Sequence, residues 1–242
     1  MKILLWALCA LLCTLSPVAA TAEEIRGYDA KEGYQYVVLG EYPQDADGAV
    51  RPILWRVLSV EDGEAFLFSE YILINGCVHP DDKEYVAFGQ VWNKTFRFAW
   101  LNGEFANEAF TEAERARLAD DEDLGAVFLV SSEDLSNETF GFKKGAGGNK
   151  ARQGYGTPYA LASGLFKYGP KGNHSSPYWT RTASVNKETS GATRCTKQEG
   201  TVGYIRCVVE DEGVRPAIRL ILGDEPFAGG EGTLGHPFYY GQ

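Results

Sequence analysis

The sequence Tyr178-Trp179-Thr180-Arg181-Thr182 and the later stretch Gly213-Val214-Arg215-Pro216-Ala217-Ile218-Arg219-Leu220-Ile221-Leu222 decide the fold of this chain. A third stretch of the same character, Pro52-Ile53-Leu54-Trp55-Arg56-Val57-Leu58, lies near its start. All three are rich in β-branched and aromatic residues, which favour strands. Together they predict a chain organised around β-sheet.

A hairpin is predicted around Asp62-Gly63. Residues 53–60 and 65–68 are β-branched or aromatic runs on either side of this dipeptide, which is a strong short-range turn signal. The period of two along a strand places Trp55 and Val57 on one face and Arg56 on the other. We therefore expect Trp55 to lie in the core rather than on a binding surface.

Between residues 95 and 118 the hydrophobic pattern changes to the period of a helix. Phe98, Leu101 and Phe105 form an apolar stripe on one helical face. Thr111 and Glu114 have the spacing of a capping box, which predicts that a second short helix starts there.

Other local signals complete the expected elements. Residues 34–39 predict an opening strand that turns at residues 40–44, and residues 126–131 predict a buried strand. Thr157 and the proline after it predict the start of a helix that ends at Gly164.

The first 22 residues have the organisation of a secretory signal peptide. Lys2 gives a positive start, residues 3–15 are apolar, and residues 18–22 supply small residues for cleavage. An uncleaved anchor is the alternative, but the apolar run is shorter than the roughly 20 residues that span a bilayer. The sequence therefore predicts a secreted protein, periplasmic or extracellular, with no membrane span in the mature chain.

Size and charge limit the classes of function. The 220 residues after the leader suffice for one domain with a sizeable core. The whole chain carries a formal charge of −10, and no Lys/Arg stripe stands out along it. Since a phosphate backbone is repelled by such a surplus of acid, no nucleic-acid partner is expected.

Three cysteines lie beyond the leader: Cys77, Cys195 and Cys207. Residues 191–209 are expected to form two short strands around residues 198–201, and opposed strands could bring Cys195 and Cys207 within disulfide distance. Export permits such a bond. A reduced, buried pair is the alternative.

Other candidate sites are weaker. Cys77 lies two residues before His79, but one loop gives no base geometry for a nucleophile. The acidic run at residues 120–123 lacks the ligand spacing of a calcium loop and predicts a solvated turn. Residues 141–156 are rich in glycine but have no phosphate-loop pattern, so a mobile loop is expected. The three histidines lack the spacing of a helical metal site, and neither a metal nor another cofactor is predicted.

Seven short motifs occur in a fixed order: Gly40–Gln44, Ile53–Leu58, Leu67–Glu70, Leu101–Phe105, Phe128–Ser131, Trp179–Thr182 and Val214–Ala217. In this order they resemble the bacterial domain of unknown function 6273 family, which is related to the C-type lectin-like and formylglycine-generating-enzyme fold. The chain departs from the family at Thr182-Ala183-Ser184, where Ser-Pro-Gly is usual, which implies a differently built loop after Trp179.

The resemblance implies an α+β fold, a single C-type lectin-like domain at residues 23–222 with an antiparallel sheet, two or three helices and long loops. It makes residues 165–176 and 186–199 the candidate ligand-facing loops. The calcium and sugar-binding tripeptides of animal C-type lectins are absent from this sequence. Residues 223–242 are left as a glycine-rich C-terminal tail, which is disordered, lies at a strand edge, or is the trace of a shortened array.

Recognition of a glycan or an extracellular protein is the leading functional hypothesis. Its binding residues would be Tyr178, Trp179, Arg181 and Asn186, because aromatic faces stack on sugars and arginine offers a forked donor. In the alternative, Trp179 fills the core and Arg181 closes a buried ion pair. An exported oxidoreductase of the formylglycine-generating type, with Cys195 and Cys207 as copper ligands, and a structural cell-surface spacer are the other hypotheses.

Overall fold

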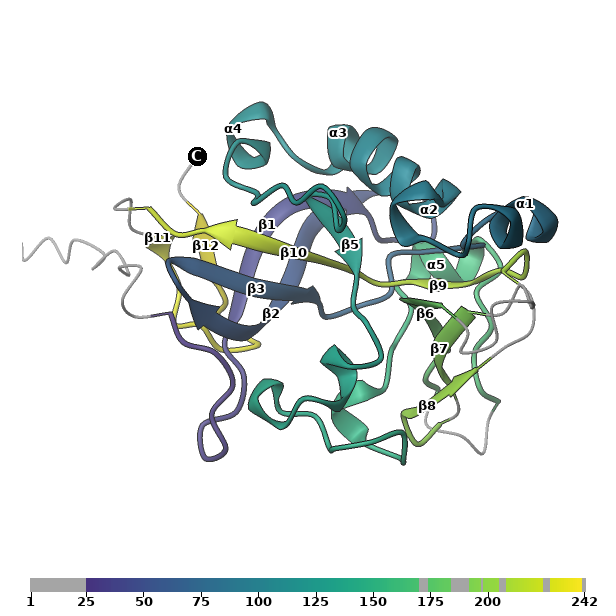
Figure 1. The fold of residues 1–242 in the computed structure, drawn as a ribbon. Coiled ribbons are helices and arrows are strands. Elements are labelled where there is room, and N and C mark those ends of the chain that lie inside the picture. The colour runs from purple at the N-terminus through teal and green to yellow at the C-terminus, as the bar shows by residue number, and fades with distance from the viewer. Residues whose placement is uncertain are drawn as a thin grey trace, which may run out of the picture.

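The structure, a computed structural model, describes residues 25–169, 174–183, 192–196, 198–204, 208–223 and 227–240. These residues form two sheets with short helices packed around them (Figure 1), so the expected α+β class is confirmed. The predicted leader lies outside the described residues. None of the helices within them has the length and apolar character needed to cross a membrane.

The larger sheet has seven strands. In spatial order they are β11 (Phe227–Gly229), β12 (Phe238–Tyr240), β1 (Tyr36–Pro43), β2 (Val50–Glu61), β3 (Glu64–Ser69), β10 (Pro216–Ile221) and β5 (Val127–Leu129). Strand β12 runs parallel to β1, and the other neighbours are antiparallel. The segment after residue 222 therefore contributes strands to the sheet, which agrees with the strand-edge alternative for the tail.

The predicted hairpin around Asp62-Gly63 is confirmed. Both residues have positive φ, 51° and 79°, as a two-residue type I′ turn between twisted strands requires. The turn joins β2 to β3, and Trp55 in β2 is fully buried, with its ring nitrogen donating to the Leu39 carbonyl at 2.8 Å. Because Arg56 on the opposite face of β2 is also buried, this strand is covered on both sides.

The smaller sheet has five strands. They are, in spatial order, β4 (Ile74–Gly76), β9 (Glu212–Val214), β6 (Tyr178–Ala183), β7 (Ala192–Thr196) and β8 (Thr201–Tyr204). The hairpin of β7 and β8 was expected, whereas the strand-rich stretch at residues 213–222 is divided between two strands, β9 and β10. The chain leaves the smaller sheet after Val214 and enters the larger one at Pro216, so the buried Arg215 marks the crossing.

Five α-helices are present among the described residues, more than the two or three expected. They are α1 (Asp82–Ala87), α2 (Phe96–Trp100), α3 (Ala106–Ala109), α4 (Glu112–Arg115) and α5 (Pro158–Ala162). A π-helical segment, η3 (Leu101–Phe105), joins α2 to α3. The expected stripe is buried at Leu101 and Phe105, while Phe98 packs against the core from its edge.

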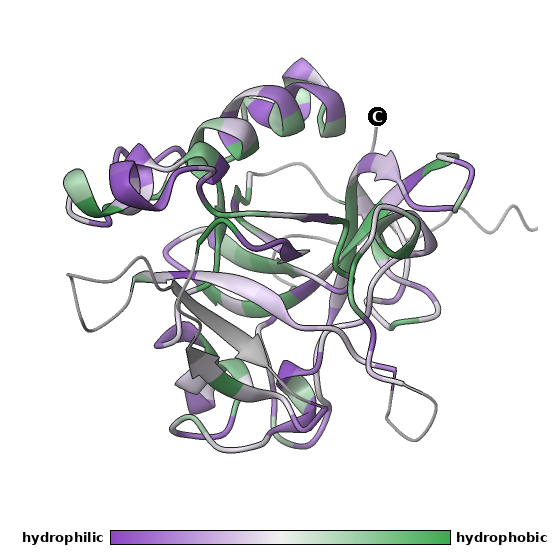
Figure 2. Ribbon diagram, turned by 90° about the vertical axis from the view of Figure 1, so that its right-hand side faces the viewer, coloured by the Kyte–Doolittle hydropathy of each residue, from purple (hydrophilic) through white to green (hydrophobic). Residues whose placement is uncertain are grey.

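Two of the predicted helix starts are confirmed by their caps. The Thr111 hydroxyl accepts from the Glu114 backbone, and the Glu114 carboxylate accepts from the Thr111 backbone, which completes the capping box of α4. Thr157 caps α5 with proline in its first turn, and Gly164 follows with φ of 100°. Figure 2 shows hydrophobic residues along the inner strands and many hydrophilic ones on the helices.

The turn expected at residues 40–44 is wrong. Strand β1 continues to Pro43 and absorbs an irregularity in pairing between Val38 and Glu41. Gly40 makes this possible, because its φ is 66° and a Cβ there would lie 2.6 Å from the Ala109 carbonyl oxygen. The reversal comes later, between Gln44 and Ala49, whose backbones are hydrogen-bonded.

Candidate functional site

Two of the four predicted binding residues lie inside the protein. Tyr178 and Trp179, at the start of β6, have no exposed surface. The Trp179 ring nitrogen donates to the Gly76 carbonyl at 2.8 Å, and the Tyr178 hydroxyl donates to the Arg152 carbonyl at 2.8 Å. Their burial matches the alternative in which these rings fill the core, and neither can touch a ligand in this conformation.

Arg181, further along β6, reaches the surface. Its Nη1 donates to the Leu129 carbonyl at 2.7 Å and to the Asp134 carboxylate at 2.8 Å, and 19% of its side chain remains exposed. The ion pair agrees with the structural alternative for Arg181, and the exposed part of its side chain is compatible with a binding role. Asn186, the fourth predicted residue, lies outside the described residues.

Arg181 borders an open hollow of about 300 Å³. Its lining combines apolar, charged, amide and hydroxyl groups, from Val91, Trp92, Asn93, Asp123, Leu124, Ser131, Arg181 and Thr182. Val91 is 41% exposed, whereas Trp92 is mostly buried. A surface of this composition suits a polar ligand that also has an apolar face.

Local hydrogen bonds shape the rim of the hollow. The Trp92 ring nitrogen donates to the Leu124 carbonyl at 3.2 Å, and the Asn93 amide donates to the Asp123 carboxylate at 3.2 Å. The Asp121 carboxylate accepts from the backbones of Asp123 and Leu124, both at 2.9 Å. The acidic run thus forms the solvated turn expected of it, and this turn supplies one wall of the hollow.

The opposite wall is held by hydroxyl groups. The Thr182 hydroxyl accepts from the Ser132 backbone at 2.8 Å and lies 3.1 Å from the Ser132 hydroxyl. The Ser131 hydroxyl accepts from the Asp134 backbone at 2.9 Å, which begins the short turn that also presents the Asp134 carboxylate to Arg181. These bonds fix the strand ends that carry Arg181 and Thr182.

Sequence reasoning found Arg181 but missed the rest of this hollow. Its lining comes from residues 91–93, 123–124, 131 and 181–182, four segments that are distant in sequence. No local pattern connects them. The sequence did not indicate Trp92 as a lining residue either, because an isolated tryptophan between a valine and an asparagine does not show whether it will face solvent.

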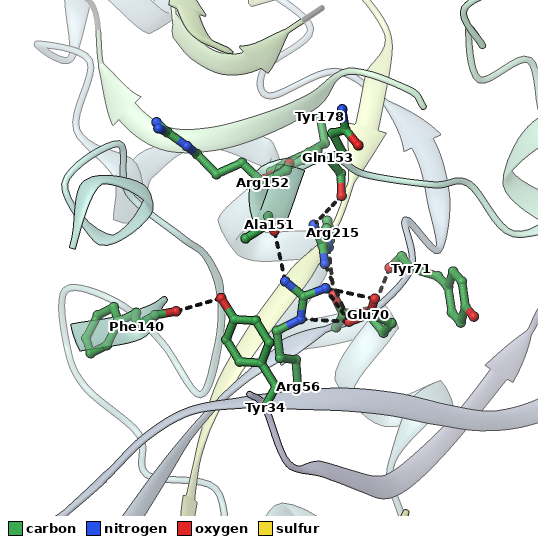
Figure 3. A network of polar contacts seen from close by, with 11 residues as sticks. Tyr34, Arg56, Glu70, Tyr71, Phe140, Ala151, Arg152, Gln153, Tyr178 and Arg215 are labelled. Atoms are coloured by element: carbon green, nitrogen blue, oxygen red, sulfur yellow. Dashed lines mark hydrogen bonds and ion pairs between the residues drawn. The ribbon is translucent and has the colours of Figure 1, made fainter. Parts of the chain in front are cut away.

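A second polar cluster lies inside the protein and joins three of the sequence motifs (Figure 3). Arg56 makes a two-pronged pair with Glu70, with Nε to Oε2 and Nη2 to Oε1 both at 2.8 Å, and Nη1 donates to the Ala151 carbonyl at 2.8 Å. Arg215 approaches the same carboxylate at 4.0 Å and donates through Nε to the Ser69 carbonyl at 2.7 Å.

The burial of this cluster indicates a structural role. Arg215 has no exposed surface, and its guanidinium lies 4.0 Å from the centre of the Phe68 ring. The Arg56 guanidinium lies 4.5 Å from the Tyr34 ring. The Glu70 carboxylate raises the pKa of Arg56 against the opposing effect of burial, so the guanidinium stays charged. The arginines that define two of the motifs thus hold the strands together.

The environment of Cys77 does not support a nucleophile. Burial raises the pKa of its thiol, and the nearby Arg97 guanidinium only partly opposes this. The His79 ring is committed to other groups: Nδ1 accepts from the Phe96 backbone at 3.0 Å, and Nε2 lies 3.4 Å from the Glu84 carboxylate.

The predicted ligand-facing loops are described in part. In the first, Phe166 is 56% exposed and meets the Tyr168 ring edge-on, with centroids 5.2 Å apart. In the second, Cys195 lies opposite Val202 in the ladder of β7 and β8. Since Cys207 lies outside the described residues, its disulfide with Cys195 stays a prediction.

No group of three or more metal-ligating side chains occurs within the ranges that the structure describes. Comparisons of the chain with protein-family models, with curated proteins and with solved structures found no match. The hollow at Arg181 is therefore characterised by its own geometry alone.

Proposed function

We propose that the protein is an exported, non-catalytic binding module that recognises a glycan or a surface protein. The observation that carries this proposal is the open hollow beside Arg181. It offers an arginine, a carboxylate, an amide and two hydroxyl groups next to the apolar Val91 and Trp92. Sugars and polar protein loops present the same mixture of hydroxyl groups and small apolar faces.

The chemistry of the lining favours binding over catalysis. The hollow contains neither histidine nor cysteine, and the Ser131 hydroxyl accepts from the Asp134 backbone instead of facing a general base. A serine nucleophile needs a base within hydrogen-bond reach. Arg181 has Nη1 fixed by Leu129 and Asp134, so its position is set before a ligand arrives.

The resemblance to the C-type lectin-like fold supports the same proposal. Such domains keep their terminal strands together and use long loops as a ligand face. Here β1 and β12 are adjacent in the larger sheet, and the chain beyond Thr182 enters the second of the two predicted loops. The α+β class and these placements are compatible with a lectin-like domain, which we propose as its fold family.

A glycan-array screen of the purified protein, run beside a pull-down from cell-surface extract, tests this proposal. Val91→Asp places a carboxylate in the hollow and should reduce capture of the selected ligand about tenfold, since it sets a charge against an apolar contact. The matched control is Val209→Asp, which makes the same change at a valine of similar exposure, 40%. The control should bind as the unmodified protein does.

Three outcomes would replace the proposal. Equal binding by both variants would move the ligand away from the hollow. Absence of any selective ligand in both screens would favour the spacer hypothesis. Copper binding by reduced protein, together with titratable thiols at Cys195 and Cys207, would favour the oxidoreductase.

A further inference from the structure

The formal charges of this chain are unevenly distributed. Residues 141–207 contain eleven of its 23 Lys and Arg but only two of its 33 Asp and Glu, namely Glu188 and Glu199. This segment therefore carries a formal charge of +9, and the remaining residues carry −19, which together give the net −10. The net value conceals a strongly basic region next to a strongly acidic one.

A buried arginine organises the first part of this basic segment. Arg152 has no exposed surface, and its guanidinium donates to three backbone carbonyls, those of Lys143 at 3.0 Å, Gly145 at 2.8 Å and Gly147 at 2.8 Å. The stretch expected to be a mobile loop is thus closed around an internal cation. Because the arginine occupies the inside, the side chains of Lys143, Lys144 and Lys150 are exposed.

Other parts of the basic segment are joined to this loop by backbone hydrogen bonds. Asn149 donates to the Glu199 carbonyl at 2.6 Å, and Val202 donates to the Ala146 carbonyl at 3.0 Å, which attaches the hairpin of β7 and β8. Ser176 donates to the Gly154 carbonyl at 2.8 Å. These bonds join the described parts of the segment, which lie away from α3 and α4 in Figure 1.

Two aromatic rings accompany the lysines in this region. Phe166 and Tyr168 belong to the loop whose other end, Ser176, bonds to Gly154, and Lys167 between them is exposed. We call the exposed side chains of Lys143, Lys144, Lys150, Phe166 and Lys167 the lysine surface.

We infer that the lysine surface binds an anionic polysaccharide, with its lysines facing carboxylate or sulfate groups. This inference rests on the proposed function and names a class of glycan for it, at a surface defined separately from the hollow. Lysines in solvent act as point charges and attract anionic groups over distances near the Debye length. An exposed aromatic ring adds a face on which a sugar can stack.

The charge of the rest of the protein favours a polysaccharide over nucleic acid. The remaining −19 repels a dense polyphosphate that extends beyond the lysine surface. A polysaccharide with a single charge per sugar has a lower charge density than a nucleic-acid duplex and has hydroxyl groups between its charges, so it loses less to this repulsion.

Binding is to be measured by calorimetry with polygalacturonate, dextran sulfate, neutral dextran and a single-stranded oligonucleotide. The triple variant Lys143→Glu, Lys144→Glu, Lys150→Glu should weaken binding to at least one of the two anionic polysaccharides by about tenfold or more. The matched control reverses three exposed lysines of the acidic part, Lys31→Glu, Lys83→Glu and Lys94→Glu. With the same net charge, the control should bind within about twofold of the unmodified protein.

The outcomes separate this inference from the proposed function. Equal weakening in the two triple variants, or no binding to either anionic polysaccharide, would overturn the lysine surface. If a glycan from the array still bound and Val91→Asp still reduced its capture, the proposed function would survive that failure. Tighter binding of the oligonucleotide, with the same dependence on the three lysines, would also overturn the inference, because the partner would then be nucleic acid.

Discussion

The interior arginines and the lysines of residues 143–150 carry the same charge but have different roles. Arg56 and Arg215 lie against the Glu70 carboxylate inside the protein, where they also contact aromatic rings and backbone carbonyls. Lys143 and Lys150 have exposed side chains on a loop closed by another buried arginine, Arg152. The arginines hold strands and loops together, and the lysines remain accessible to a partner.

The chemistry of the two side chains explains this division. A guanidinium is planar, is weakly hydrated and offers five donors, so it can be buried when several acceptors surround it. An ammonium is a compact, strongly hydrated charge, and burying it costs more. In this protein the buried arginines therefore stabilise the fold, whereas exposed lysines can contact a partner.

The largest effect is expected from removing an aromatic ring of the interior. Trp179→Ala should lower the free energy of unfolding by about 3 to 5 kcal/mol, because it leaves a cavity and an unpaired Gly76 carbonyl. Phe166→Ala, at the exposed loop, should change it by less than about 0.5 kcal/mol. Urea denaturation measures both. Similar losses of unfolding free energy in the two variants would contradict the difference proposed between the interior and the loop.

Glu70→Gln should lower the free energy of unfolding by about 3 kcal/mol. It removes the carboxylate that compensates two buried guanidinium groups, and breaking a buried pair from one side leaves an uncompensated charge. Glu61→Gln, at an exposed end of β2, is the control and should be nearly neutral. An unchanged free energy of unfolding in Glu70→Gln would show that carbonyls and aromatic rings alone are sufficient to stabilise the buried Arg56.

Exchanging the two cations tests the comparison directly. Arg152→Lys keeps the charge but cannot reach three carbonyls, so a loss of about 2 kcal/mol is expected. The reciprocal variant Lys150→Arg should stay within about 0.5 kcal/mol. Hydrogen exchange of residues 143–150 should rise only in the first variant. Unchanged exchange in Arg152→Lys would mean that the loop is held by other contacts.

The smallest effect concerns alkaline pH. Burial raises the pKa of Tyr85 to about 12, above its usual value, so the folded protein keeps this proton after the unfolded chain has begun to lose it. The resulting contribution is complete below about pH 10 and is lost as the pH rises toward 12. Tyr85→Phe should therefore make the protein about 1 kcal/mol more stable relative to the unmodified protein at pH 11 than at pH 8.

Local signals predicted the elements that depend on neighbouring residues. Asp62-Gly63 specifies its own backbone conformation, and Thr111 and Glu114 satisfy each other within one helical turn. The sequence could therefore place the central hairpin and the start of α4. It could not place Gly40 within a strand, because the contact with Ala109 that fills the space beside it is distant along the chain.

The candidate sites were harder to predict for the same reason. Arg152 lies in a glycine-rich stretch, and nothing in the neighbouring residues indicates that it donates to three backbone carbonyls inside the protein. Glu70 joins Arg56 and Arg215, which are far apart in sequence. The net charge of the whole chain does not reveal the basic segment, because the acids outside residues 141–207 outweigh it.

The parallel pairing of β1 with β12 has a consequence for how the chain reaches its native state. Val37 pairs with Phe238, so one edge of β1 has no native neighbour until the distal end of the chain arrives. Until then, β1 would present unpaired backbone groups, as any uncovered strand edge does. A chain that ends at Ile221 should therefore aggregate more readily than the full chain, while its helix content changes less.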